Sequence, residues 1–153
     1  MKRTAKLPRV SAIPLASWER DGVVAALRKV GLPADDVEAP DRLFWRFETA
    51  DVVLVGYGGL ELYGADALLR SLVTLPPLRR RGIGAAIVAN LEVEARALGC
   101  RTVWLLTTTA AEFFAELGYA ACERSAAPEP IRRSRQFSEL CPAAAALMKK
   151  PLD

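Results

Sequence analysis

The segment LRRRGIGAA, residues 78–86, places three consecutive arginines directly before two glycines that are spaced one residue apart. The preceding segment ALLRSLVTL, residues 67–75, reads as a strand that ends at a proline pair, because proline cannot continue a ladder. The following segment, 82–100, has apolar residues at helical spacing and a glycine stop at Gly99. Strand, basic glycine turn and helix start in this order predict an anion site, because the first amides of a helix lack internal partners and carry partial positive charge.

Two familiar nucleotide motifs do not fit this turn. A dinucleotide fingerprint needs a third glycine at position 87, which is Ile87, and a Walker motif needs a Gly-Lys-Ser/Thr sequence that is absent. The spacing that remains is Arg79-x-x-Gly82-x-Gly84.

Composition limits the classes of protein that need to be considered. The chain has 153 residues, 52% of them hydrophobic, which predicts one globular domain over 1–153 with a flexible start at 1–8. No apolar run approaches the roughly 20 residues that span a bilayer, and no secretory h-region follows the basic start, so we expect a cytoplasmic protein with no membrane partner. A net charge of +3 is too small to indicate nucleic acid as the main partner.

The chain contains no histidine and three cysteines. The absence of histidine removes the commonest general base, the Ser-His and Cys-His nucleophile pairs and most zinc sites, so any enzyme must use carboxylates, hydroxyls, water or backbone groups. Cys100, Cys122 and Cys141 lack metal-type spacing, and we expect free thiols and no metal.

Hydrophobic periodicity predicts a mixed sheet with helices on its faces. The expected helices begin at Ser17, Gly82, Thr109 and Pro130; the first runs to Gly31, the third has Thr109 and Glu112 as a capping box, and the last runs to about Leu140. The expected strands cover 9–14, 43–49, 52–64, 67–75, 101–107, a short segment near 119–124, and 143–149.

Three segments carry a resemblance to a known family. The turn motif at 79–84, the preceding SLVTLPPL and the later LLTTTAAEFFAELGY resemble the signatures of the Gcn5-related N-acetyltransferase (GNAT) superfamily over about residues 10–149. The tail IRRSRQFSELCPAAAALM, with the other segments, is most similar to the small acetyltransferases encoded with arsenic-resistance genes. The superfamily resemblance implies an α/β (α+β) fold with a twisted, mostly antiparallel sheet of six to seven strands and a splayed fourth and fifth strand.

The same resemblance implies acetyl-coenzyme A as co-substrate. Its pantetheine would bond to the main chain of Leu72, Val73 and Thr74, and a backbone N–H near Thr74 would polarise the thioester carbonyl. The pyrophosphate would lie on the turn, which comprises Arg79, Arg80, Arg81, Gly82, Ile83 and Gly84.

Two charged residues lie inside otherwise apolar strands. Glu61 is the favoured general base, directly or through a water, because a carboxylate in an apolar run is costly unless it is paired or working. The alternatives are an ion pair with Arg70 and an outward-facing side chain. Arg70 and Ser71 are assigned to substrate binding, with a structural pairing of Arg70 to Glu61 or Glu48 as the alternative.

The sequence departs from the superfamily pattern at two positions. Thr107 stands where asparagine is frequent and Phe114 stands where a tyrosine acid is frequent. Tyr119 is assigned as a substitute acid, beside Tyr63, Tyr57 and water as further sources of the proton. Thr107 and Phe114 are assigned to cofactor contact, and helix capping and core packing are their plainer uses.

The tail region walls the acceptor site in this superfamily. Arg132, with Arg133 and Arg135, could select an acidic substrate or could form a solvated helix face. The arsenic association raises the alternative that the cysteines bind trivalent arsenic, but buried structural thiols are the favoured interpretation.

The prediction is therefore an acetyl-coenzyme A-dependent N-acetyltransferase that acts on a small amine such as an arsenic-containing or other toxic amino acid. The alternative is an acyl-coenzyme A sensor or partner-binding module without turnover, which the missing tyrosine and asparagine keep open. The final strand could pair with a second copy, so a homodimer is a further option.

Overall fold

The computed structural model describes residues 8–32, 34, 42–75, 82–140 and 144–153. Four residues discussed above lie outside the described ranges: Arg79, Arg80, Arg81 and Cys141. Residues 1–7 of the flexible start predicted at 1–8 also lie outside them. The strands are β1 (Ser11–Pro14), β2 (Arg42–Glu48), β3 (Leu54–Tyr63), β4 (Asp66–Thr74), β5 (Thr102–Thr107), β6 (Ala120–Cys122) and β7 (Ala146–Pro151). The α-helices are α1 (Asp21–Lys29), α2 (Ile83–Ala97), α3 (Ala111–Glu116) and α4 (Glu129–Arg132). Two short 3-10 helices, η1 (Ser17–Glu19) and η2 (Arg124–Ala126), and a π-helix, η3 (Gln136–Leu140), complete the set.

The strands form one seven-stranded sheet in the order β1-β2-β3-β4-β5-β7-β6. Every neighbouring pair is antiparallel except β4 and β5, which run parallel. The predicted mixed, mostly antiparallel sheet is confirmed. A parallel pair needs a crossover connection, and α2 supplies it.

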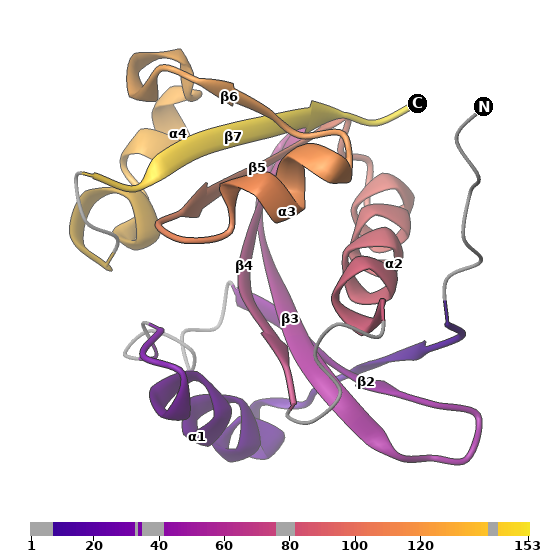
Figure 1. Cartoon of the computed structure of the whole chain (residues 1–153). Coiled ribbons are helices and arrows are strands. Elements are labelled where there is room, and N and C mark those ends of the chain that lie inside the picture. The colour runs from indigo at the N-terminus through magenta and orange to yellow at the C-terminus, as the bar shows by residue number, and fades with distance from the viewer. Residues whose placement is uncertain (1–7, 33, 35–41, 76–81, 141–143) are drawn as a thin grey trace.

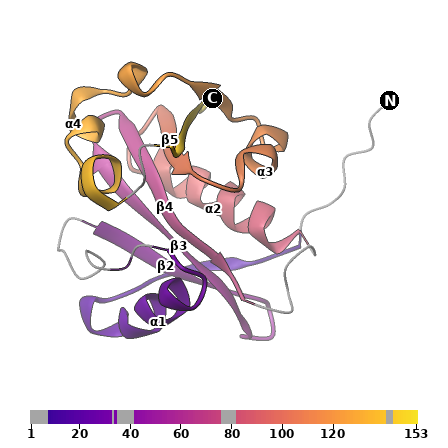
Figure 2. The ribbon, with the colours of Figure 1, turned by 60° about the vertical axis from the view of Figure 1, so that its left-hand side comes forward.

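Helices cover both faces of this sheet, with α1 and α2 on opposite sides (Figure 1). The α2 face holds the largest apolar cluster, which joins α2 residues such as Ile87 and Leu91 to Trp45 and Phe47 of β2. The other face carries α1 and α4 (Figure 2). It has two smaller clusters, one that joins α1 to Phe44 and one that joins Ile131 of α4 to Trp104. We call the side of the sheet that α2 covers the α2 face and the opposite side the α1 face.

Two glycines of β3 allow α2 to lie close to the sheet. A Cβ atom at Gly56 would lie 2.2 Å from the carbonyl oxygen of Val73 and 2.7 Å from Ile87 Cδ1. A Cβ atom at Gly58 would lie 2.7 Å from Leu91 Cδ1. Larger residues at these positions would push the helix outward, so the glycines set the distance between α2 and the sheet.

Three sequence predictions about helices are wrong in detail. The first α-helix begins at Asp21 rather than Ser17, after the turn η1. The tail helix is divided into α4 and η3 instead of running from Pro130 to Leu140. The N-cap residue of α3 is Ala110 rather than Thr109, so the predicted Thr109–Glu112 capping box is not formed. The Ala110 amide donates instead to Thr107 Oγ1 at 2.9 Å.

Within the described residues, every helix falls short of the length and apolar character that crossing a lipid bilayer requires.

Candidate functional site

Strands β4 and β5 pair over only part of their length. Their partners are Asp66 with Thr102, Ala67 with Val103, and Leu68 with Trp104. Beyond these pairs β4 continues to Thr74, and in Figure 1 it runs away from β5 and β7. From residue 69 to Thr74, therefore, β4 has a partner strand on its β3 side but none on its other side within the described part of the chain. We call residues 69–74 the open stretch of β4, and the predicted cofactor residues Leu72, Val73 and Thr74 all lie in it.

The start of α2 lies beside the end of this open stretch. Gly82 precedes the helix with a left-handed φ of 76°, and Ile83 and Gly84 are its first residues. A Cβ atom at Gly84 would lie 3.2 Å from Phe113 Cζ and 3.4 Å from Thr74 Oγ1. The first amides and the positive dipole end of α2 are therefore placed next to Thr74.

A bulge interrupts β4 within the open stretch. Tyr57 pairs with Val73 and Gly59 pairs with Arg70, so two residues of β4, Ser71 and its neighbour Leu72, face one residue of β3. Ser71 has a φ of 60°, which is uncommon for a residue with a side chain. Its hydroxyl oxygen accepts a hydrogen bond from Arg70 Nε at 3.0 Å. The bulge thus carries both backbone strain and a side-chain contact that holds it.

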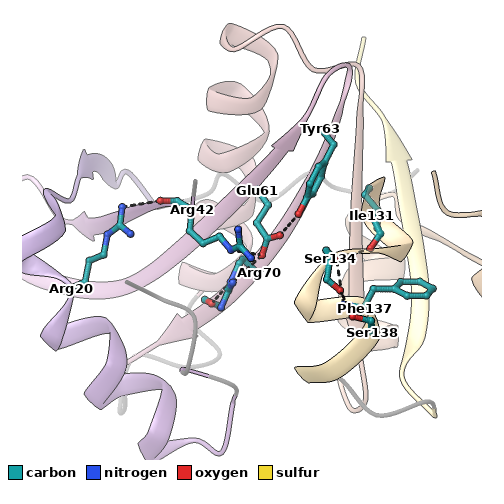
Figure 3. A network of polar contacts seen from close by, with 10 residues as sticks. Arg20, Arg42, Glu61, Tyr63, Arg70, Ile131, Ser134, Phe137 and Ser138 are labelled. Carbon is teal, nitrogen blue, oxygen red and sulfur yellow. Dashed lines mark hydrogen bonds and ion pairs between the residues drawn. The ribbon is translucent and has the colours of Figure 1, made fainter. Parts of the chain in front are cut away.

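Glu61 is held by a buried group of donors on the α1 face. Its side chain is 1% exposed, and Arg70 Nη1 donates to Oε2 at 2.9 Å. Arg42 Nε lies 3.4 Å from the same oxygen, and the Tyr63 hydroxyl donates to Oε1 (Figure 3). The ion pair with Arg70, the alternative considered for both residues, is confirmed. Two guanidinium groups thus lie against one oxygen of this buried carboxylate.

A further arginine extends this group toward α1. Arg20 Nη2 donates to the Arg42 carbonyl oxygen at 2.8 Å. The guanidinium carbons of Arg20 and Arg70 lie 5.2 and 5.4 Å from the centroid of Phe44, which is within cation–π range. The sequence reasoning missed Arg20 and Arg42. The β2–β3 register, in which Arg42 faces Glu61, is the signal that would have found Arg42.

Tyr119 lies away from this group, in the cluster of the α2 face. Its hydroxyl donates to Glu92 Oε2 at 2.9 Å, and Glu92 also pairs with Lys150 Nζ at 2.9 Å. Burial, reinforced by the Glu92 carboxylate, raises the pKa of Tyr119 far above its ordinary value. The structure does not bring Tyr119 and Glu61 together, since they lie on opposite faces of the sheet.

The other two residues predicted to contact the cofactor have neighbours of their own. Thr107 Oγ1 accepts the amide of Ala110, the residue just before α3; the helix has no side-chain cap, so this is a contact next to the helix start and not the cap that the sequence suggested. Phe114 is buried, with its ring edge-on to Phe113 at 5.0 Å and to Tyr119 at 5.6 Å between centroids. Phe113 is the member of this aromatic group that lies against the helix start at Gly84.

The tail arginines and the thiols have local contacts. Arg132 is exposed at the end of α4, and the neighbouring Arg133 pairs with Glu129 one helical turn earlier. The Cys100 thiol donates to the Gly64 carbonyl and the Cys122 thiol to the Leu147 carbonyl. Burial raises the pKa of both thiols, so they are protonated at neutral pH. Across the described residues no group of three potential metal-binding His, Cys, Asp or Glu side chains occurs.

The raised pKa of Tyr119 predicts a measurable pH dependence of stability. A phenol whose pKa is higher in the folded than in the unfolded protein stabilises the fold fully below about pH 10, and this contribution is lost as the pH rises further. We expect the free energy of unfolding, measured in urea between pH 8 and 11, to fall less steeply for Tyr119→Phe than for the wild type. The difference in slope has an upper limit of about 1.4 kcal/mol per pH unit. Equal slopes would contradict the buried, Glu92-bound phenol.

Comparison with known proteins identifies the family. The family model described as "Acetyltransferase (GNAT) family" matches residues 11–119. No curated protein sequence matches this chain.

Among solved structures, N-acetylglutamate synthase from Neisseria gonorrhoeae, complexed with coenzyme A and N-acetyl-glutamate, superposes with a TM-score of 0.77 at 20% identity. The match covers 97% of this chain but only 36% of the synthase, so the chain spans about a third of that protein. Rv2747 from Mycobacterium tuberculosis, in complex with CoA and NLQ, gives a TM-score of 0.75 at 24% identity over 95% of this chain and 100% of that one. An aminoglycoside 6'-N-acetyltransferase complexed with coenzyme A gives 0.68 at 19% identity over 95% and 97%.

The matched residues run from β1 through α3 to Tyr119. They therefore include the open stretch of β4, the bulge and the glycine turn at the start of α2. With well over half of its length matched by the family model, this chain belongs to the acetyltransferase (GNAT) family.

Proposed function

We propose that this protein transfers an acetyl group from acetyl-coenzyme A to the amino group of a small molecule. The observation that carries the proposal is the juxtaposition of the open stretch of β4 with the glycine start of α2. An extended chain can bond to a free strand edge, and a phosphate can bind to the amides at a helix start. Coenzyme A has both parts, an extended pantetheine with amide groups and a pyrophosphate.

In this arrangement the pantetheine bonds to the main chain of Leu72, Val73 and Thr74 as an added strand. The pyrophosphate lies on the amides of Gly82, Ile83 and Gly84, and in the sequence the cationic Arg79–Arg81 directly precede them. The three solved structures described above contain coenzyme A, which supports the same co-substrate for this chain.

The reaction is direct attack of a neutral amine on the thioester. The N–C bond forms and the C–S bond breaks, while the amine loses a proton and the coenzyme A thiolate gains one. A main-chain N–H of β4 near Thr74 stabilises the oxyanion that develops on the thioester carbonyl. A thiol has a reference pKa of about 8.5, so the thiolate is a tolerable leaving group without a dedicated acid.

The acceptor is proposed to be a small amino acid or a related amine. One of the solved relatives holds N-acetyl-glutamate, an acetylated amino acid. The tail resemblance to acetyltransferases encoded with arsenic-resistance genes adds arsenic-containing amino acids to the candidates. Acetylation removes the positive charge and the nucleophilicity of such an amine.

Thiol release from acetyl-coenzyme A, in the presence of a panel of amines, tests this proposal. The panel consists of the common amino acids with arsenic- and phosphorus-containing analogues. We expect release that depends on one class of amine, and a mass increase of one acetyl group on that amine. Gly84→Leu places a large side chain against Phe113 and Thr74 and should weaken acetyl-coenzyme A binding by more than about tenfold.

The matched control is Gly99→Ala at the far end of α2, where no neighbour lies within 4 Å of the new Cβ atom. It should bind the coenzyme as the wild type does. If the protein binds the coenzyme but releases no thiol with any amine, the proposal of an enzyme is wrong and an acyl-coenzyme A sensor is the better interpretation.

A further inference from the structure

We propose that Glu61 is a positioning residue rather than the general base, and that it acts through Arg70 on the bulge at Ser71. In this role it fixes the open stretch of β4 along which acetyl-coenzyme A is proposed to lie. The inference rests on the proposed function and deepens it, because it assigns the buried charges next to the site.

The first step is the strain at Ser71. A residue with a side chain at a φ of 60° is held there by its surroundings. The side-chain contact that the structure gives Ser71 is the hydrogen bond from Arg70 Nε to its hydroxyl. Arg70 is therefore in a position to keep the bulge in its strained form.

The second step is the support of Arg70 itself. Its side chain is 1% exposed, and its Nη1 donates to Glu61 Oε2 at 2.9 Å. A single guanidinium thus links the carboxylate of β3 to the bulge of β4 (Figure 3). Because a planar guanidinium has fixed donor directions, fixing Nη1 also fixes the direction of Nε.

The third step concerns Glu61 as a base. Oε1 accepts from the Tyr63 hydroxyl, and Oε2 faces both Arg70 and Arg42. A proton taken from an amine would have to displace one of these donors and would leave two buried guanidinium groups beside a neutral acid. The geometry therefore favours a lasting ionic support over proton transfer.

The fourth step is what the bulge does for the strand. Leu72 packs against the cluster of the α2 face and Val73 belongs to the cluster of the α1 face. Removing the extra residue would shift the register by one and exchange these faces. The main-chain groups of β4 directed to the open side would change with it, and these are the groups proposed to bind the pantetheine.

The test combines Glu61→Gln with Ser71→Gly. Glutamine keeps the shape of Glu61 but loses its charge, so the hold on Arg70 weakens. We expect the KM and Kd for acetyl-coenzyme A to rise about tenfold, with the midpoint of the pH profile of kcat/KM unchanged. Glycine adopts a φ of 60° without strain, so Glu61→Gln/Ser71→Gly should recover most of the lost affinity.

Glu48→Gln is the matched control. It removes the charge of a β2 carboxylate that pairs with Arg46 at 2.7 Å, away from the bulge, and should leave coenzyme affinity unchanged. Melting temperatures of all variants verify that they are folded. Coenzyme affinity by calorimetry gives a readout that needs no turnover.

The outcomes separate the inference from the proposed function. If the wild type transfers acetyl groups but Glu61→Gln loses one limb of the pH profile and glycine at 71 restores nothing, Glu61 is the base and the inference is overturned. An unchanged coenzyme affinity in Glu61→Gln overturns it as well. If the wild-type protein does not bind acetyl-coenzyme A at all, the proposed function fails first and the inference fails with it.

Discussion

Replacing Glu61 with leucine is expected to lower the free energy of unfolding by about 3–5 kcal/mol. The substitution removes the carboxylate that faces Arg70 and Arg42, both of which are buried, and leaves the two guanidinium groups close to each other in an apolar environment. The Tyr63 hydroxyl loses its acceptor in the same step. Urea denaturation at pH 7, compared with the wild type, measures the change.

The matched control for this prediction is Glu48→Leu. Arg46, the partner of Glu48, is 32% exposed, so water replaces the lost contact and the cost should be below about 1 kcal/mol. The double variant Glu61→Leu/Arg70→Met should be destabilised by less than the sum of its single variants, because the two changes remove both members of the same buried ion pair. Equal costs for Glu61→Leu and Glu48→Leu would show that the buried ion pairs carry no special weight.

Local sequence patterns were sufficient for the main elements. The long helix α2 was predicted because its apolar residues recur at helical spacing and Gly99, which has a φ of 91°, ends it. The splayed strand pair followed from the family resemblance. The helix depends on signals within a few residues of each other, which a sequence shows directly, whereas the strand pair joins segments on either side of α2 and needed the resemblance.

Side-chain hydrogen bonds to the backbone, one over a long sequence distance and one local, lie at the helix boundaries that were predicted wrongly. Ser17 is a good N-cap type, yet α1 begins only at Asp21, and the intervening Arg20 is buried with its guanidinium on the Arg42 carbonyl. In the tail, the buried Ser134 hydroxyl donates to the Ile131 carbonyl at 2.6 Å and separates α4 from η3. Neither contact can be read from local propensity.

The main-chain features of the candidate site could be predicted more fully than the contacts among its buried charged side chains. The glycine turn follows from motif spacing, and the open stretch of β4 was implied by the family resemblance. Arg42 was missed because its role depends on the β2–β3 register, and a shift of one residue would have turned it to the other face. The sequence also could not separate a catalytic Glu61 from a paired one, because both interpretations require the same residue type at the same position.

Gly56→Ala is expected to lower the free energy of unfolding by about 3 kcal/mol or more and to weaken acetyl-coenzyme A binding. The new methyl group would lie 2.2 Å from the Val73 carbonyl oxygen and 2.7 Å from Ile87 Cδ1, so either β4 or α2 must move. Both elements belong to the proposed coenzyme site, since Val73 lies in the open stretch of β4 and α2 begins at the glycine turn. Urea denaturation and calorimetry with acetyl-coenzyme A measure the two effects.

Gly31→Ala separates this crowding from the general effect of losing a glycine. Gly31 has a φ of 75° and no atom within 4 Å of the added Cβ, so the substitution costs only the left-handed strain of about 1–2 kcal/mol and should leave coenzyme affinity unchanged. If Gly56→Ala lowered the free energy of unfolding no more than Gly31→Ala does, the contacts at Gly56 would not be too close for a methyl group, which contradicts the prediction. A large loss of stability with unchanged affinity would instead mean that the coenzyme does not depend on how α2 and β4 are placed against each other.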